Sequence, residues 1–246
     1  MKLVNDFRIT DRCRNKTIHA SISILLLIHA VHPLISDGLY GWEAWQIDSV
    51  DTEGFVGTYC SIVVGSDAHP HISYYDDTNR QLKYATLSDG EWYIEAADTA
   101  EHVGTYSAII VDGENNPHIS YYDQSSYDLK YARREKSMWS YQWPDDSGSV
   151  GAYTSIALDM SGHPHISYVD EGKLNLKYTT WNGEEWLSET VDDGIDVGRH
   201  NSLDLDGEGS PHISYFGDES CGALKYAYLD QGEWHIEKID SVPPPG

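Results

Sequence analysis

The chain has 246 residues, enough for one sizeable core or a small array of repeats. Forty acidic residues face sixteen basic ones, which gives a formal net charge of −24. Such an acidic surface repels phosphate backbones and anionic lipid head groups, so the composition argues against nucleic-acid binding and against membrane-surface binding by the folded part.

The first 36 residues have the layout of a signal peptide. Residues 1–17 are basic and polar, residues 18–35 are mostly apolar, and a turn-forming Ser-Asp-Gly follows. Pro33 interrupts the apolar run and no clear cleavage site precedes Asp37, so an uncleaved membrane anchor is the alternative. We expect export and a secreted or cell-surface protein. Without this segment the chain carries 11 − 38 = −27 charges.

The rest of the chain repeats every 47 residues. The string PHISY begins at Pro70, Pro117, Pro164 and Pro211. Each copy follows a VG-x-Y or VG-x-H string and precedes an LKY string, and a tryptophan closes each unit. These closing residues, which we assign a structural role, are Trp92, Trp139, Trp186 and Trp234. The sequence therefore indicates a fold built from repeated units.

Each repeat contains four short runs with strand character. In the third repeat they are Tyr153–Asp159, Pro164–Asp170, Leu174–Thr180 and Trp186–Val191, separated by the Gly and Asn residues that hairpins use. No segment after residue 40 keeps a helical period. Four antiparallel strands per repeat form the blade of a β-propeller, with VG-x-Y as the innermost strand. We expect an all-β domain over residues 37–241 and a Pro-rich tail over residues 242–246.

The count of strands leaves one over. Trp45–Val50 matches the outer strand of a blade whose other three strands are missing. Four blades can close directly, another chain can complete the ring by self-association, or the chain can be a fragment of a larger surface protein. In a closed ring Cys60 and Cys221 would come close enough to consider a disulfide, although two unpaired thiols are favoured.

These repeats resemble those of secreted microbial β-propellers with recurring PHISYYD and LKYA strings, and are similar in style to sialidase-like and fucose-lectin-like propellers. The period also resembles that of the five-bladed tachylectin-type lectins, whose motifs are not visible here. The resemblance covers residues 42–240. It implies the fold and leaves the activity open, because propellers host many functions.

One histidine recurs on the second strand of every repeat, as His71, His118, His165 and His212. A ring of metal ligands would need these side chains to face the central axis, which second strands normally do not reach. We expect buried structural imidazoles, each bonded to a neighbouring strand or blade, and we assign no metal site.

One face of the propeller collects the loops that enter each first strand and the loops that join second to third strands; we call it the entry face. The candidate ligand-binding residues on it are Tyr59, Tyr106, Tyr153, His200, Asp76, Asp123, Asp170 and Asp218. Aromatic rings stack on sugar C–H groups, and carboxylates accept hydroxyl hydrogen bonds or hold calcium. The alternative is that the rings pack between blades and the aspartates close turns.

Catalysis is disfavoured. A sialidase mechanism needs an arginine cluster, and after residue 36 the chain has only Arg80, Arg133, Arg134 and Arg199, in no pattern. No repeat departs from the others so as to mark one active centre. We expect a lectin-like binding or scaffolding propeller with carbohydrate or a cell-surface ligand as partner and no required cofactor. A glycoside hydrolase and a purely structural fragment are the alternatives.

Overall fold

The computed structural model describes residues 7–10, 17–20, 47–217 and 222–241. Strands β1 (Phe7–Thr10) and β2 (Thr17–Ala20) pair antiparallel in a small unit that ends at Val50. Most of the apolar run of the predicted export signal lies outside the described residues, as do Asp218, Cys221 and the Pro-rich tail. None of the described segments is a helix of the length and apolarity that would cross a membrane.

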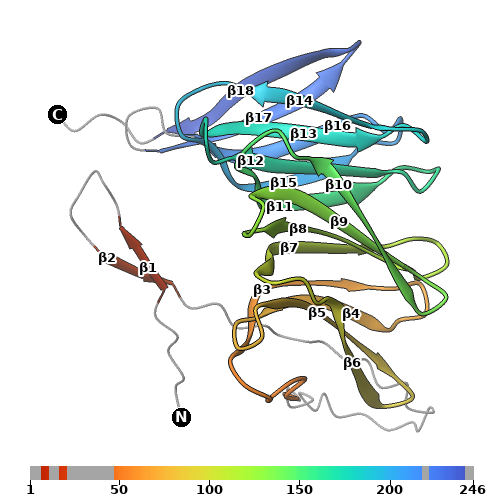
Figure 1. Ribbon diagram of the computed structural model, residues 1–246. Coiled ribbons are helices and arrows are strands. Elements are labelled where there is room, and N and C mark those ends of the chain that lie inside the picture. Colours follow the sequence, from red (N-terminus) through yellow and green to blue (C-terminus); the bar gives the residue numbers. More distant parts are fainter. Residues whose placement is uncertain (1–6, 11–16, 21–46, 218–221, 242–246) are drawn as a thin grey trace, which may run out of the picture. The chain divides into compact units, whose positions relative to one another are not determined.

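Four antiparallel four-stranded sheets follow, and Figure 1 colours them in chain order from orange to blue. Blade 1 consists of β3 (Val56–Val64), β4 (Pro70–Asp76), β5 (Gln81–Ser88) and β6 (Glu91–Asp98). Blade 2 consists of β7 (Val103–Val111), β8 (Pro117–Asp123), β9 (Asp128–Glu135) and β10 (Met138–Asp145). Blade 3 consists of β11 (Val150–Leu158), β12 (Pro164–Asp170), β13 (Asn175–Trp181) and β14 (Trp186–Asp192). Blade 4 consists of β15 (Val197–Leu205), β16 (Pro211–Gly217), β17 (Ala223–Asp230) and β18 (Glu233–Ser241).

The predicted all-β propeller of four-stranded blades is confirmed. Within each blade the strands pair in chain order, with the PHISY strand second. The first strands of consecutive blades lie next to one another, and Figure 1 shows the sheets stacked in chain order from β3–β6 to β15–β18. The predicted turns also form, since Asp112 N donates to Asn116 O at 3.1 Å and Asp206 N donates to Ser210 O at 3.0 Å.

The predicted extra strand is not seen where the structure can test it. Residues 47–50 of the segment Trp45–Val50 form no strand, and Trp45 lies outside the described residues. A strand needs a partner edge for its backbone groups, and no described strand pairs with this segment. Asp51, which follows directly, nevertheless contacts blade 1, as described below.

The core lies between the sheets because both faces of each inner blade are apolar. All seven residues of β4, β8 and β12 are buried, so both faces of these second strands are covered. One apolar cluster joins Leu82 and Tyr84 of blade 1 to Ile119 and Tyr121 of blade 2. Equivalent clusters join blades 2 and 3 and blades 3 and 4, so each blade depends on its neighbours.

A buried ionic contact recurs at every junction between blades. Asp98, at the end of the outer strand of blade 1, accepts hydrogen bonds from Tyr121 Oη at 2.7 Å and Lys130 Nζ at 2.6 Å in blade 2. Lys130 is only 4% exposed, so it requires this carboxylate. Asp145 plays the same part between blades 2 and 3, and Asp192 between blades 3 and 4. Asp51 gives Tyr74 and Lys83 of blade 1 the same contact.

Candidate functional site

The predicted aromatic residues of the entry face form one continuous row. The ring centroids of Tyr59 and Tyr106 lie 4.6 Å apart, those of Tyr106 and Tyr153 4.5 Å apart, and those of Tyr153 and His200 5.2 Å apart. Each residue follows a positive-φ glycine by two positions and has a positive φ of 52–55° itself. The first strand bulges there, since its pairing with the second strand shifts register around Tyr59 and its equivalents.

This row is only partly open to a ligand. Tyr59 and His200 at its ends are exposed, whereas Tyr106 and Tyr153 are half-buried. Burial, reinforced by the neighbouring Tyr153 and Tyr59, raises the pKa of Tyr106 above its usual value, so its hydroxyl stays protonated. The row therefore offers aromatic rings and tyrosine hydroxyl groups, and its ligand-binding role stays a prediction.

The predicted carboxylates of the same face are engaged in turns. Asp76 accepts a hydrogen bond from the backbone N–H of Asn79 at 2.9 Å, Asp123 from that of Ser125 at 2.9 Å, and Asp170 from that of Lys173 at 2.9 Å. All three aspartates are buried. Asp218 lies outside the described residues. This geometry is that of the turn-closing alternative, and it leaves these carboxylates little surface for a sugar or for calcium.

The recurring histidines lie inside the blades. In each blade the imidazole Nδ1 lies 2.5 Å from the hydroxyl of the LKY tyrosine on the next strand. The pairs are His71–Tyr84, His118–Tyr131, His165–Tyr178 and His212–Tyr226. Three of the closing tryptophans pack edge-on against the LKY tyrosine of the preceding blade: Trp139 on Tyr84, Trp186 on Tyr131 and Trp234 on Tyr178. Trp92 is half-buried in the first blade.

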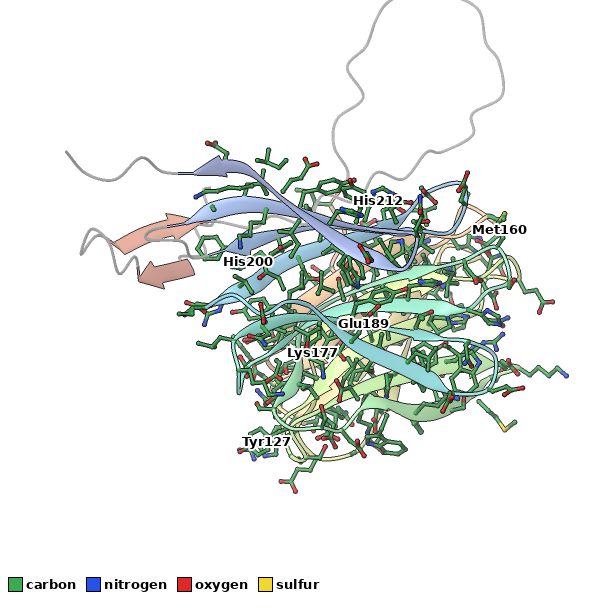
Figure 2. The ribbon with its side chains drawn as sticks, turned by 90° about the horizontal axis from the view of Figure 1, so that it is seen from above. Tyr127, Met160, Lys177, Glu189, His200 and His212 are labelled. Atoms are coloured by element: carbon green, nitrogen blue, oxygen red, sulfur yellow. The ribbon has the colours of Figure 1, made fainter. Side chains whose placement is uncertain are left out.

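A groove of about 670 Å³ opens between blades 2 and 3 on the face opposite the entry face. Figure 2 shows the two faces, with Met160 at the groove and His200 of the aromatic row on opposite sides of the stack. Blade 2 contributes Asp112, Glu114, Arg133 and Glu135, and blade 3 contributes His163 and Trp181. Among the described residues, no group of three or more His, Cys, Asp or Glu side chains is arranged to hold a metal ion.

Arg133 is the distinctive residue of this groove. Its Nη1 lies 2.8 Å from Glu135 Oε1, and its Nη2 donates to Asp112 Oδ2 at 3.3 Å. The side chain is 38% exposed, so part of the guanidinium is available to a ligand. The equivalent positions of blades 1, 3 and 4 hold Thr86, Thr180 and Tyr228. Blade 2 therefore differs from the other repeats at this position, which aligning the repeats residue by residue would have revealed.

His118 lies at the base of the groove and is 1% exposed. Burial and then the charge of Arg133 lower its pKa to about 4, although Asp112 opposes the shift. Its Nε2 has no hydrogen-bond partner and lies 3.5 Å from Asp112 Oδ2. Burial acts to raise the pKa of Asp112, but hydrogen bonds from Asn116 and Glu114 outweigh it and lower the pKa to about 2. The groove floor thus pairs a neutral imidazole with a firmly ionised carboxylate.

Comparison with known proteins identifies the fold. No protein-family model matches the chain, and no curated protein matches it by sequence. Among solved structures it is similar to AofleA from Arthrobotrys oligospora, at 14% identity and a TM-score of 0.54 over 74% of this chain and 56% of that one. The chain thus spans just over half the length of that protein.

Two further solved structures are comparably similar. One is the Aleuria aurantia lectin in complex with Fucα1-6GlcNAc, at 11% identity and a TM-score of 0.52 over 74% of this chain and 64% of that one. The other is an ulvan lyase of a polysaccharide lyase family, bound to GlcA(1-4)Rha3S, at 14% identity and a TM-score of 0.55 over 75% of this chain and 55% of that one. At these identities the likeness shows a shared fold and does not assign an activity.

Proposed function

We propose that this chain is an exported carbohydrate-binding propeller and that its sugar site is the groove between blades 2 and 3. The observation that carries the proposal is Arg133, held between Asp112 and Glu135 beside Trp181 in one blade junction only. Sugar hydroxyls need donors and acceptors side by side, which a guanidinium and two carboxylates supply. An indole stacks on the C–H face of a sugar ring.

The charge of the groove favours a neutral sugar. Three carboxylates, those of Asp112, Glu114 and Glu135, line the groove together with one guanidinium. A sialic or uronic acid would bring a further negative charge into this acidic site and would be repelled. The sugars bound in two structural neighbours, Fucα1-6GlcNAc and GlcA(1-4)Rha3S, are neutral and acidic respectively, and the groove is better suited to the neutral kind.

The test is a glycan array followed by calorimetry with the wild type, with and without calcium. Arg133→Thr installs the residue that blades 1 and 3 carry at this position, so it should fold normally. Loss of a charged hydrogen bond is worth ~1.5–3 kcal/mol, so we expect Kd for the best neutral glycan to rise at least about tenfold. Arg199→Thr, the same change on the entry face, is the matched control.

Three results would count against the proposal. If no glycan on the array binds, with or without calcium, the protein is not a lectin. A ligand lost in Tyr153→Asn but kept in Arg133→Thr would place binding on the aromatic row, as first predicted; Asn tolerates the positive φ at that position. Turnover of chromogenic glycosides would favour the hydrolase alternative.

A further inference from the structure

The outward side of blade 4 exposes residues that its counterparts bury. Leu224 is 48% exposed, whereas the equivalent Leu82, Leu129 and Leu176 are all 0% exposed. Ser214 is exposed, whereas the equivalent serines of the other three blades are 0% exposed. Phe216, at 38% exposed, extends this apolar surface. Blade 4 thus exposes the surface against which, in each of the other blades, the following blade packs.

The outward side of blade 1 presents the complementary surface. Ile62 is 44% exposed, whereas the equivalent Ile109 and Ile156 of the next two blades are 6% and 8% exposed. Val64 is 62% exposed on the same strand. In the inner blades this surface is covered by the preceding blade. The two ends of the stack therefore carry the two halves of a junction that the chain itself forms three times.

Residues equivalent to those that make the polar contact of that junction also lie at both ends. Ser73 Oγ and Ser107 Oγ lie 2.9 Å apart across the first junction, and Ser120 Oγ donates to Thr154 Oγ1 at 2.9 Å across the second. Ser167 meets Asn201 across the third. The corresponding residues at the open ends are Ser214 on blade 4 and Cys60 on blade 1.

We propose that two copies of this chain associate head to tail, blade 4 of each against blade 1 of the other, and close one ring. Each interface would repeat the internal junction, with the same rotation from blade to blade. Two copies of four blades give eight, the upper end of the usual range of about 4–8 blades for propellers, so a third copy would not fit. Two identical head-to-tail interfaces then give a closed dimer rather than a fibre.

Asp51 distinguishes the new junction from the internal ones. It gives Tyr74 and Lys83 the carboxylate that the outer strand of a preceding blade gives at every internal junction. It also follows Trp45 by six residues, as Asp98 follows Trp92. Blade 1 therefore already has the contact that an outer strand of a preceding blade would make. It lacks the contacts with the three inner strands of such a blade, which β15–β17 of a second copy would supply. The segment ending at Asp51 and the end of the partner's β18 would then compete for the outer position.

Disulfide trapping tests the proposed register. In a Cys13→Ser, Cys221→Ser background, Ser214→Cys should cross-link to Cys60 of the partner subunit under mild oxidation, because side-chain oxygens at this pair of positions lie 2.9 Å apart in the first two junctions. We expect a covalent dimer with two disulfides, identified by mass spectrometry. Glu208→Cys, an exposed loop position of the same blade, is the matched control and should give no such product.

Sedimentation velocity on the full chain gives an independent measure. We expect a dimer whose Kd rises at least about tenfold in Leu224→Glu, which places a charge in the junction. Added salt should strengthen the dimer, because each copy carries a formal net charge of −24. A monomer at every concentration and salt level would overturn the proposal. So would open-ended oligomers, or cross-linking at Glu208→Cys as readily as at Ser214→Cys.

Discussion

Single residues of this propeller differ in function according to the junction they face. The histidine on the second strand occurs in every blade and shares a hydrogen bond with a tyrosine in each. Only His118 lies beneath the groove that Arg133 and Asp112 line. The same histidine is structural in every blade, and in blade 2 it also belongs to a candidate site because of the residues that surround it.

His118 predicts an acid-sensitive stability. Its pKa is lowered from 6.5 to about 4, so the unfolded chain binds more protons between these values and the free energy of unfolding falls as the pH drops through that window. From pH 7 to pH 5 the loss from this residue is about 2 kcal/mol. Urea denaturation gives the difference in the free energy of unfolding between pH 7 and pH 5. In His118→Gln this difference should be smaller than in the wild type by that amount.

The matched control for this prediction is His163→Gln, which removes a loop histidine that lines the same groove. Asp112 acts at lower pH, because its pKa is lowered from 3.8 to about 2 and its contribution is lost only within that interval. A His118→Gln variant with an unchanged difference between pH 7 and pH 5 would show that the imidazole does not titrate as inferred.

At the scale of the strand, the VG dipeptide fixes how closely two blades approach. Gly104 has a φ of +109°, and a Cβ built there would lie 2.7 Å from Leu82 Cα in the preceding blade. Gly151 and Gly198 meet Leu129 and Leu176 in the same way. Gly57 has a similar φ of +95°, but no atom lies within 4 Å of its built Cβ, because no blade precedes blade 1 among the described residues.

This contrast separates backbone strain from blade packing. Alanine at either position costs about 1 kcal/mol for the positive φ, and at Gly104 it also forces two backbones apart at a further cost of ~1–3 kcal/mol. We expect Gly104→Ala to lower the free energy of unfolding by about 2 kcal/mol more than Gly57→Ala does, measured in urea. Equal losses would mean that the glycine serves only the bulge and not the approach of the blades.

At the scale of the molecule, stability should fall from the middle of the stack toward its ends. Every residue of β4, β8 and β12 is buried, whereas β16 alternates between buried and exposed positions and β3, the first strand of blade 1, has no fully buried residue. In a repeat array each unit is stabilised by its neighbours, so a terminal blade has one stabilising junction where an inner blade has two.

Hydrogen exchange at dilute protein concentration should show this gradient. We expect amides of β16 to exchange at least about tenfold faster than the equivalent amides of β12. If the protein associates through blade 4, the difference in exchange rate between β16 and β12 should decrease as the protein concentration rises. Equal protection of β16 and β12 in a dilute monomer would show that the open side of blade 4 is covered by other residues of this chain.

The sequence by itself determined the repeat, the four strands of each blade and their order. It could do so because hydrophobic alternation and turn residues are local signals, and a 47-residue period repeats them in register. It also determined the identity of the entry face, since the direction of the first strand fixes where each loop emerges. Asp76, Asp123 and Asp170 lie in turns, yet whether such a carboxylate meets solvent or closes a turn depends on distances that no local pattern contains.

Only the tertiary structure decided where a ligand can fit and what remains uncovered. The groove arises between two blades, so Arg133 and Trp181 come together only through packing across a junction, although they lie in different repeats. The Asp–Tyr–Lys contacts likewise join residues 23 and 32 positions apart. The exposure of Leu224 and Ile62, identical in type to buried residues elsewhere, reflects the neighbour that each end blade lacks. Whether a residue is buried depends on what packs against it, and the sequence determines that only through the tertiary structure.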